Sequence, residues 1–92
     1  MYVMVSYDIV DDRTRLKVMK FLKDFGTRVQ LSVFECDLPD EKHFRRMKQG
    51  VEELINKRED RVRYYPICKS CLKKTVISGW GEIEEDEGFY VV

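Results

Sequence analysis

The sequence predicts one α+β domain in which two helices cover one face of a β-sheet. Its length of 92 residues provides for one hydrophobic core and leaves no room for a second domain. Segments in which apolar residues alternate with a period of two, as in strands, take turns along the chain with segments that have helical spacing. A core this small is only marginally stable, so we expect oligomerisation to complete it.

The first predicted element is a buried strand over residues 2–9, which is rich in β-branched and aromatic residues and contains neither Pro nor Gly. Successive side chains of a strand point to opposite faces of a sheet. The face suited to a helix-covered core carries Val3, Val5, Tyr7 and Ile9. The other face, of mixed polarity, carries Tyr2, Met4, Ser6 and Asp8.

Two helices and further strands are predicted after this strand. The first helix has Asp11 or Asp12 as its N-terminal cap and Gly26 as its stop. Its apolar side consists of Val18, Phe21, Leu22 and Phe25. Residues 27–38 have strand composition, and Pro39 then opens a second helix. The apolar stripe of this helix consists of Phe44, Met47, Val51, Leu54 and Ile55. Strands are predicted again over residues 61–67, 75–78 and 89–92.

This order of elements fits a ferredoxin-like β-α-β-β-α-β sandwich with an extra C-terminal strand. The plan needs two strands between the helices, so residues 28–38 must contain a tight or bulged hairpin, although Leu31 and Ser32 are unfavourable turn residues. If both helices cover one sheet face, the other face lies open until a second subunit covers it. We therefore predict a single domain over residues 1–92 that forms a face-to-face homodimer, with residues 80–92 as a tail that pairs with the partner protomer.

Charge and hydropathy give no global argument for binding nucleic acid or a membrane, because 17 Lys and Arg balance 17 Asp and Glu. Basic residues nevertheless dominate residues 13–23 and 45–48, and acidic residues gather in residues 82–87, so a local basic face is expected. Nothing at the start resembles a signal peptide, and no apolar run reaches the roughly 18 residues of a membrane span. We expect a cytoplasmic protein with no membrane partner.

Asp8 is the leading candidate for a functional residue, because a carboxylate near the end of a central strand is costly to bury without a hydrogen-bond or metal partner. One interpretation is that Asp8 accepts hydrogen bonds from backbone amides of the next helix. The other is a metal site, since a twofold axis near this face would bring two copies of Asp8 together and Mg²⁺ keeps most of its waters. Asp11 and Asp12 are interpreted as helix caps.

Four basic residues have two interpretations, as a solvated surface or as contacts to a phosphate backbone. These residues are Arg13, Arg15, Lys17 and Arg28. None of them alone is specific to nucleic acid.

The cysteines give only a weak signal for a metal. Cys68 and Cys71 form one C-x-x-C motif, and a full zinc site would need Cys36 and His43 to converge on it. A thioredoxin-like role would need the motif at a helix start, which the sequence does not predict here. We favour a structural thiol pair or an occasional disulfide. His43 is the only histidine, so nucleophilic catalysis by a Ser-His or Cys-His pair has almost no support.

Short strings of sequence carry a resemblance to a known family. They are Tyr-Asp-Ile at residues 7–9, Asp-Asp-Arg-x-Arg at 11–15, Gly-x-Arg-Val-Gln-x-Ser-Val-Phe-Glu at 26–35, Val-Arg-Tyr-Tyr-Pro at 62–66 and Gly-Trp-Gly at 79–81. With these strings the chain resembles the small CRISPR-associated endonuclease of spacer acquisition over nearly its whole length. Lys17 stands where some relatives have Arg, and Cys68 and Cys71 are not general to that family.

The resemblance implies a ferredoxin-like homodimer that holds a divalent cation, Mg²⁺ or another such as Mn²⁺, between its subunits through Asp8. It also implies metal-dependent hydrolysis of phosphodiester bonds in single-stranded RNA or duplex DNA. Tyr7, Ser32 and Phe34 match the remaining positions of the catalytic motifs, and Arg15 and Arg28 match basic positions of the family. A second implied role is that of a scaffold, a central dimer that bridges CRISPR integrase subunits along captured duplex DNA.

Two other functions remain open at this point. A toxin-type RNA interferase on the same fold is excluded by no residue of the chain. A non-enzymatic ferredoxin-like sensor of small molecules would offer no reason for Asp8 to lie beside Arg15. The two Asp8 carboxylates of a dimer are few protein ligands for catalytic metal ions, so any nuclease activity is expected to be weak.

Overall fold

The computed structural model describes residues 1–81 and 90–91 of the chain and contains nine helices and strands in this part. In order they are β1 (Tyr2–Asp8), α1 (Asp12–Leu22), β2 (Thr27–Gln30), β3 (Val33–Asp37), α2 (Glu41–Leu54), β4 (Arg61–Ile67), α3 (Lys69–Lys73), β5 (Val76–Ile77) and β6 (Tyr90–Val91). The first six form the predicted β-α-β-β-α-β plan, so the ferredoxin-like fold is confirmed.

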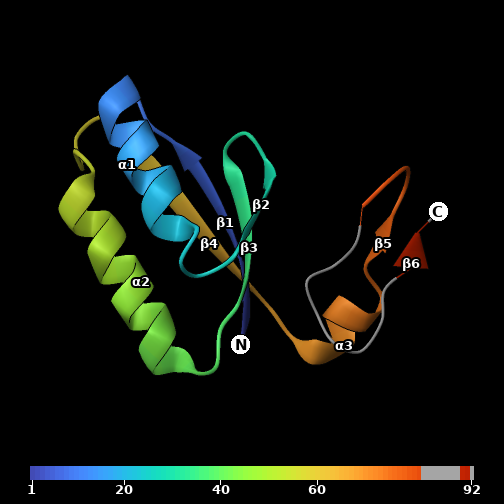
Figure 1. The fold of residues 1–92 in the computed structure, drawn as a ribbon. Coiled ribbons are helices and arrows are strands. Elements are labelled where there is room, and N and C mark those ends of the chain that lie inside the picture. Colours follow the sequence, from blue (N-terminus) through green and yellow to red (C-terminus); the bar gives the residue numbers. More distant parts are fainter. Residues whose placement is uncertain (82–89, 92) are drawn as a thin grey trace.

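The main sheet has the strand order β2-β3-β1-β4, and all its neighbouring strands are antiparallel. Helices α1 and α2 lie together on one side of this sheet (Figure 1). Strand β1 occupies an interior position between β3 and β4. Its two faces therefore have different surroundings, one covered by the helices and the other turned away from them.

The core lies between the sheet and the two helices, where the predicted alternation of β1 is confirmed. Val3 and Val5 are fully buried, and Tyr7 and Ile9 are nearly so. The other strands and both helices complete the same cluster with Val18, Leu22, Phe34, Cys36, Leu38, Met47 and Val51. Because burial of one such side chain contributes about 1.5–3 kcal/mol, this cluster is the main source of the fold's stability.

The hairpin between the helices turns at Leu31 and Ser32, the two residues that local turn preferences disfavour. Its register shifts between Arg28 and Gln30, which confirms the bulged hairpin. Tyr7 holds the turn from the neighbouring strand: its backbone amide donates to the Ser32 carbonyl at 3.0 Å, and its hydroxyl donates to the Leu31 carbonyl at 3.1 Å. Tertiary hydrogen bonds thus stabilise a turn that the local sequence does not favour.

Helix α1 begins as predicted but ends earlier than Gly26. Asp11 is the N-terminal cap, and Lys23 caps the C-terminal end. The prediction that Gly26 stops the helix is wrong, because Gly26 does not adopt a positive φ and lies beyond the cap. A Cβ at this position would overlap the Glu35 carbonyl oxygen and lie 2.6 Å from Cys36 Sγ. Gly26 is thus required by the close approach of the chain to β3.

Helix α3 is an element that the sequence did not predict. Its Leu72 packs against Tyr2, and both side chains are only 5% exposed. The expectation that the whole second face of β1 lies open is therefore wrong for Tyr2, which the chain itself covers. Met4 and Ser6 are half-buried on that face, and Asp8 is exposed.

Strands β5 and β6 form a separate, parallel two-stranded sheet within one chain. The predicted tail falls largely on residues 82–89 and 92, which lie outside the described residues, so its pairing with a partner protomer stays a prediction. In the part of the chain that is described, no helix combines the length and apolarity that crossing a bilayer requires.

Candidate nucleic-acid and metal site

Asp8 is the last residue of β1 and its side chain is exposed to solvent. The alternation of the strand turns it away from the helices, on the same face as Ser6. The antiparallel register pairs Asp8 with Arg61 and Ser6 with Arg63 on β4. These residues line one shallow hollow together with Tyr7 and Tyr65. One carboxylate thus lies in a hollow with two guanidinium groups.

The carboxylates around Asp8 are engaged in structural hydrogen bonds. Asp11 accepts from the Thr14 amide at 2.9 Å and from its hydroxyl at 3.0 Å, and these bonds lower the pKa of Asp11. Asp60 accepts from the backbone amides of Val10 and Asn56, at 3.0 and 2.8 Å. Both acids stabilise the ends of secondary-structure elements and are not available as ligands.

The Asp8 carboxylate has no hydrogen bond or ion pair to any residue that the structure describes. The interpretation of Asp8 as a carboxylate bound to the amides of the next helix is therefore wrong, and Asp11 fills that role. A solvent-exposed carboxylate with free oxygens suits Mg²⁺, which binds through one or two carboxylates and retains waters. Within the described residues no three His, Cys, Asp or Glu side chains gather at one point, so a single chain supplies only part of a metal site.

Arg15 folds back over the turn that follows Asp8. Its Nη2 donates to the carbonyl of Ile9 at 2.9 Å and to that of Val10 at 3.3 Å, and its Nε donates to the Ile9 carbonyl at 3.2 Å. Its Nη1 pairs with Asp12 at 2.6 Å. Every nitrogen of this guanidinium therefore has a partner within the chain. The structure gives Arg15 a role in fixing the β1–α1 turn, and a role as a phosphate contact stays a prediction.

Tyr7, Ser32 and Phe34 lie where β1 meets the hairpin. Phe34 is fully buried, and its ring centroid lies 6.3 Å from that of Tyr7. Ser32 contributes the carbonyl that accepts the Tyr7 amide. Burial raises the pKa of Tyr7, and the charges of Arg28 and Arg15 oppose this rise. The geometry suits these three residues to positioning the end of β1, and a catalytic role for them stays a prediction.

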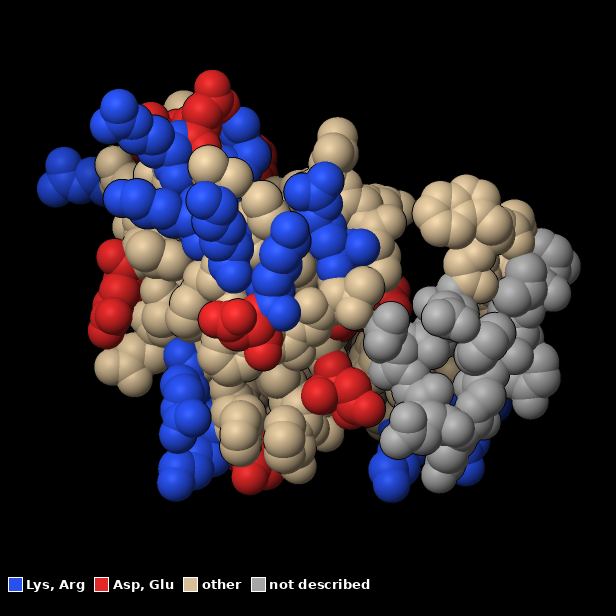
Figure 2. All heavy atoms as spheres, in the orientation of Figure 1, with Lys and Arg blue, Asp and Glu red and all other residues tan. Residues whose placement is uncertain are grey.

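The predicted basic residues lie on the surface. Lys and Arg side chains gather over α1 in Figure 2, where Arg13 and Lys17 are one helical turn apart and exposed to solvent. Lys20 and Lys23 continue this series. Arg28 is exposed on β2, the edge strand of the sheet. A local basic surface therefore exists despite the neutral total charge.

Comparison with known proteins identifies the family. The family model for the CRISPR associated protein Cas2 matches residues 1–75. The chain belongs to the Cas2 family. A Cas2 relative from Chloroflexus aurantiacus, named a CRISPR-associated endoribonuclease, is 40% identical over 92 residues, which cover 100% of this chain and 98% of the relative. The family resemblance inferred from the sequence strings is thereby confirmed.

Solved structures support the same assignment. Cas2 of Streptococcus pyogenes matches with a TM-score of 0.73 and 30% identity, over 82% of this chain and 95% of that one. A chain in a structure described as a partial Cas6-RT-Cas1–Cas2 complex matches with a TM-score of 0.71 and 27% identity, over 80% of each chain. The ferredoxin-like fold described above is therefore a Cas2 fold.

Two residues of the candidate site, Arg61 and Arg63, were missed by the sequence analysis. The signal was present, because residues 61–67 were predicted as a strand, and its alternation puts Arg61, Arg63 and Tyr65 on one face. What the sequence did not provide was the register that sets Arg61 opposite Asp8.

The zinc hypothesis is wrong for the described residues. Cys36 is buried in the core, and burial raises the pKa of its thiol to about 11. His43 lies on α2 and its Nδ1 is 2.8 Å from Asp40, the residue that caps this helix. Neither residue converges on Cys68 and Cys71. The expectation that this motif lacks a helix start is also wrong, because Cys68 immediately precedes α3.

Proposed function

We propose that this Cas2 protein acts in CRISPR adaptation as a homodimer that binds nucleic acid and hydrolyses its phosphodiester bonds with a divalent cation. The observation that carries the proposal is the state of Asp8: among the acids of the β1–α1 turn it alone, in the described structure, keeps both carboxylate oxygens free. The names of relatives, endoribonuclease and endonuclease, support the reaction class.

The proposed dimer would supply metal ligands that one chain lacks. In the described hollow a single protomer offers one carboxylate, that of Asp8, whereas two copies related by a twofold axis near the open sheet face would offer two. That face presents Met4 and Ser6, and Tyr65 beside them is 40% exposed. Covering this face with a second copy removes Met4 and Tyr65 from water and completes the ligand set.

In the reaction, Mg²⁺ or Mn²⁺ would neutralise charge on the non-bridging phosphate oxygens and lower the pKa of an attacking water. Asp8 would hold the cation on the open face of the sheet. Arg61 and Arg63, which line the same hollow, attract the phosphate to that point. Arg15 keeps the turn after Asp8 in place through the Ile9 and Val10 carbonyls. The residue set is sparse, so we expect slow turnover.

The scaffold role rests on the basic surface over α1 and on the resemblance to a chain from a complex that contains Cas1. Exposed Lys and Arg side chains bind the phosphate backbone without reading the bases. We infer that duplex DNA lies along this surface and that the CRISPR integrase subunits are the protein partners. Single-stranded RNA is the alternative substrate of the same site.

The test replaces Asp8 by Asn, which removes the charge and retains the size of the side chain. We expect Asp8→Asn to lose cleavage of RNA and DNA in Mg²⁺ and to retain the dimer mass in light scattering and the affinity for duplex DNA. Asp24→Asn is the matched control, because Asp24 is an exposed acid beyond the end of α1 and makes the same change of charge. It should cleave as the wild type does.

Three outcomes would contradict parts of the proposal. Cleavage that survives in Asp8→Asn would place the reaction elsewhere, and a folded wild-type monomer would remove the shared metal site. Failure of the protein to bind integrase subunits in a pull-down, with cleavage intact, would favour the toxin-type RNA interferase. Absence of both cleavage and nucleic-acid binding would favour the ferredoxin-like sensor.

A further inference from the structure

Cys68 and Cys71 lie at the start of α3, away from Asp8. Both side chains are exposed and carry free thiols. Residues three apart in a helical turn have Cβ atoms about 5–6 Å from each other, whereas a disulfide spans about 3.5–4.5 Å, so Cys68, which precedes α3 in extended backbone, must shift slightly for the bond to form. Cys68 Sγ lies 3.2 Å from Ser70 Oγ, within hydrogen-bond distance. Two exposed thiols three residues apart therefore need only a local shift before α3 to close as a disulfide.

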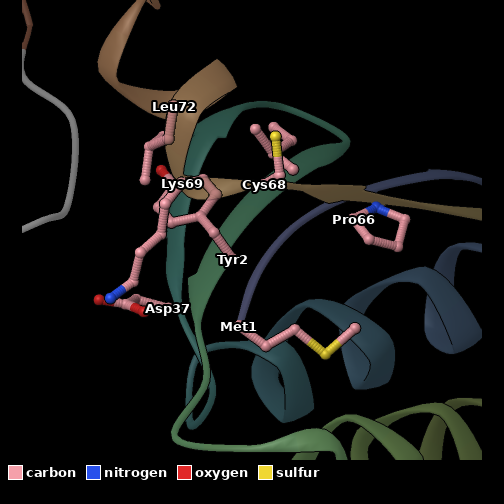
Figure 3. Close-up of a pocket in the computed structure, with 8 residues that line it drawn as sticks. Met1, Tyr2, Asp37, Pro66, Cys68, Lys69 and Leu72 are labelled. Atoms are coloured by element: carbon pink, nitrogen blue, oxygen red, sulfur yellow. The ribbon is translucent and has the colours of Figure 1, made fainter.

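A hollow of about 400 Å³ adjoins one member of this pair. Cys68 and Lys69 line it together with Tyr2 and Leu72, as Figure 3 shows, and Cys71 does not line it. Asp37 is the one acid on its wall. Lys69, next to Cys68, is the one base on its described wall. The hollow leaves room beside the Cys68 thiol for a small molecule.

We propose that Cys68 and Cys71 form a reversible dithiol–disulfide site that exchanges with low-molecular-weight disulfides such as glutathione disulfide. The Cys68 thiolate attacks one sulfur of the small disulfide, a new S–S bond forms, and one small thiolate leaves. Cys71 then loses its proton to solvent and attacks the Cys68 sulfur, and the second small thiolate leaves. Two protein thiols are oxidised by two electrons, and one small disulfide is reduced to two thiols.

The two cysteines have unequal roles in this exchange. Hydrogen bonds from Ser70, and next from Cys71, lower the pKa of Cys68 from its usual 9.0 to about 7. The bond with Cys68 raises the pKa of Cys71. At pH 7 a thiol with a lowered pKa has a larger thiolate fraction, and its lower intrinsic nucleophilicity offsets only part of this gain. Cys68 should therefore attack first, and Cys71 should resolve the mixed disulfide.

The site is independent of the proposed nuclease. Leu72 of α3 packs on Tyr2, at the opposite end of β1 from Asp8. Six residue steps along the strand separate Tyr2 from Asp8 by roughly 20 Å. Oxidation of the pair should therefore leave metal-dependent cleavage unchanged, so that failure of either proposal can be distinguished from failure of the other.

The experiment incubates the reduced full-length protein with glutathione disulfide at pH 7 and follows its intact mass. The wild type should lose two hydrogens, with at most a transient glutathione adduct, and dithiothreitol should restore the original mass. Cys71→Ser should accumulate a stable adduct at Cys68, because the second attack is missing. Cys68→Ser should form its adduct at Cys71 more slowly than Cys71→Ser forms its adduct at Cys68, because Ser70 still lowers the pKa of Cys68 in Cys71→Ser. Cys36 remains in every variant and should stay unmodified until the protein is unfolded.

Several results would overturn the proposal. The wild type could retain its reduced mass, carry two glutathione adducts, or form only disulfides between molecules. Equal adduct rates in the two serine variants would also refute the assigned roles. Both variants alter exposed side chains, and circular dichroism at equal concentration checks that each has the wild-type fold.

Discussion

Arg15 has one role in the prediction from sequence and a different role in the structure, and substitution can distinguish the two. The sequence predicts a phosphate contact, whereas the structure uses the guanidinium to bind the carbonyls of Ile9 and Val10 and the carboxylate of Asp12. The two roles respond differently to substitution. Arg15→Ala removes both the charge and the donors, and Arg15→Lys retains the charge but loses the fork of donors that reaches two carbonyls at once.

The expected cost follows from the hydrogen bonds that the substitution removes. A hydrogen bond that involves a charged group contributes about 1.5–3 kcal/mol when buried. The Arg15 side chain is 44% exposed, and a solvent-exposed ion pair such as that with Asp12 contributes at most about 1 kcal/mol, so the total must be reduced. We expect Arg15→Ala to lower the free energy of unfolding by about 1–2 kcal/mol. For a domain of 92 residues this lowers Tm by about 5–10 °C.

Thermal unfolding and the salt dependence of duplex binding together decide between the two roles. If Arg15 holds the turn, both variants lower Tm and cleavage, and the log-log slope of affinity against salt is unchanged. Lys17→Ala is the matched control, because Lys17 is an exposed cation on the same helix with no partner in the described residues. It should retain Tm and flatten the slope by about 0.9 for each phosphate that is no longer neutralised, or about 1.8 for a dimer that engages one duplex. An unchanged Tm with a flattened slope in Arg15→Ala would refute the structural role.

Two further predictions concern the core. Gly26→Ala should lower the free energy of unfolding by about 1–3 kcal/mol in denaturant titration, because the new Cβ meets backbone atoms of β3, and an unchanged midpoint would contradict this close approach. The Tyr64 hydroxyl is buried without a partner among the described residues, so Tyr64→Phe should leave stability unchanged or raise it by up to about 1 kcal/mol. Burial raises the pKa of Tyr64 from 10.0 to about 12, so the folded wild type binds the proton more tightly than the unfolded chain and loses stability as pH rises through this interval. Tyr64→Phe should lose less stability there, and equal losses would contradict the prediction.

The elements that sequence analysis predicted are those whose signal is local. The alternation of β1 and the apolar stripe of α2 each depend only on residues within the element, and both are confirmed. Helix α3 has five residues, too few for a periodic pattern to appear, and was missed. The turn at Leu31 was expected to be unfavourable because its stabilising donor, Tyr7, lies 24 residues away in the chain.

In the candidate site, too, the residues with a local sequence signal were predicted and those brought in by strand pairing were missed. Asp8 was identified from its place at the end of a strand, which is a local property. Arg61 and Arg63 join it only through the pairing of β1 with β4, which the sequence does not specify. The sequence analysis assigned Arg15 to a phosphate contact and did not find its actual acceptor, the backbone carbonyl of Ile9. Every residue carries a backbone carbonyl, so a sequence gives no sign of which one an arginine will bind.

The three aspartates of the β1–α1 turn are chemically alike, and the backbone alone gives them different tasks. The cap must lie three residues before the amide it binds, which selects Asp11 for Thr14. Asp12 then falls on the first turn of α1, three residues from Arg15, and pairs with it. Ile9, which is 3% exposed, anchors the intervening chain in the core and separates Asp8 from the helix amides. Asp8 is therefore available to a ligand because its neighbours satisfy the helix first, and the burial of Ile9 is the physical cause of that availability.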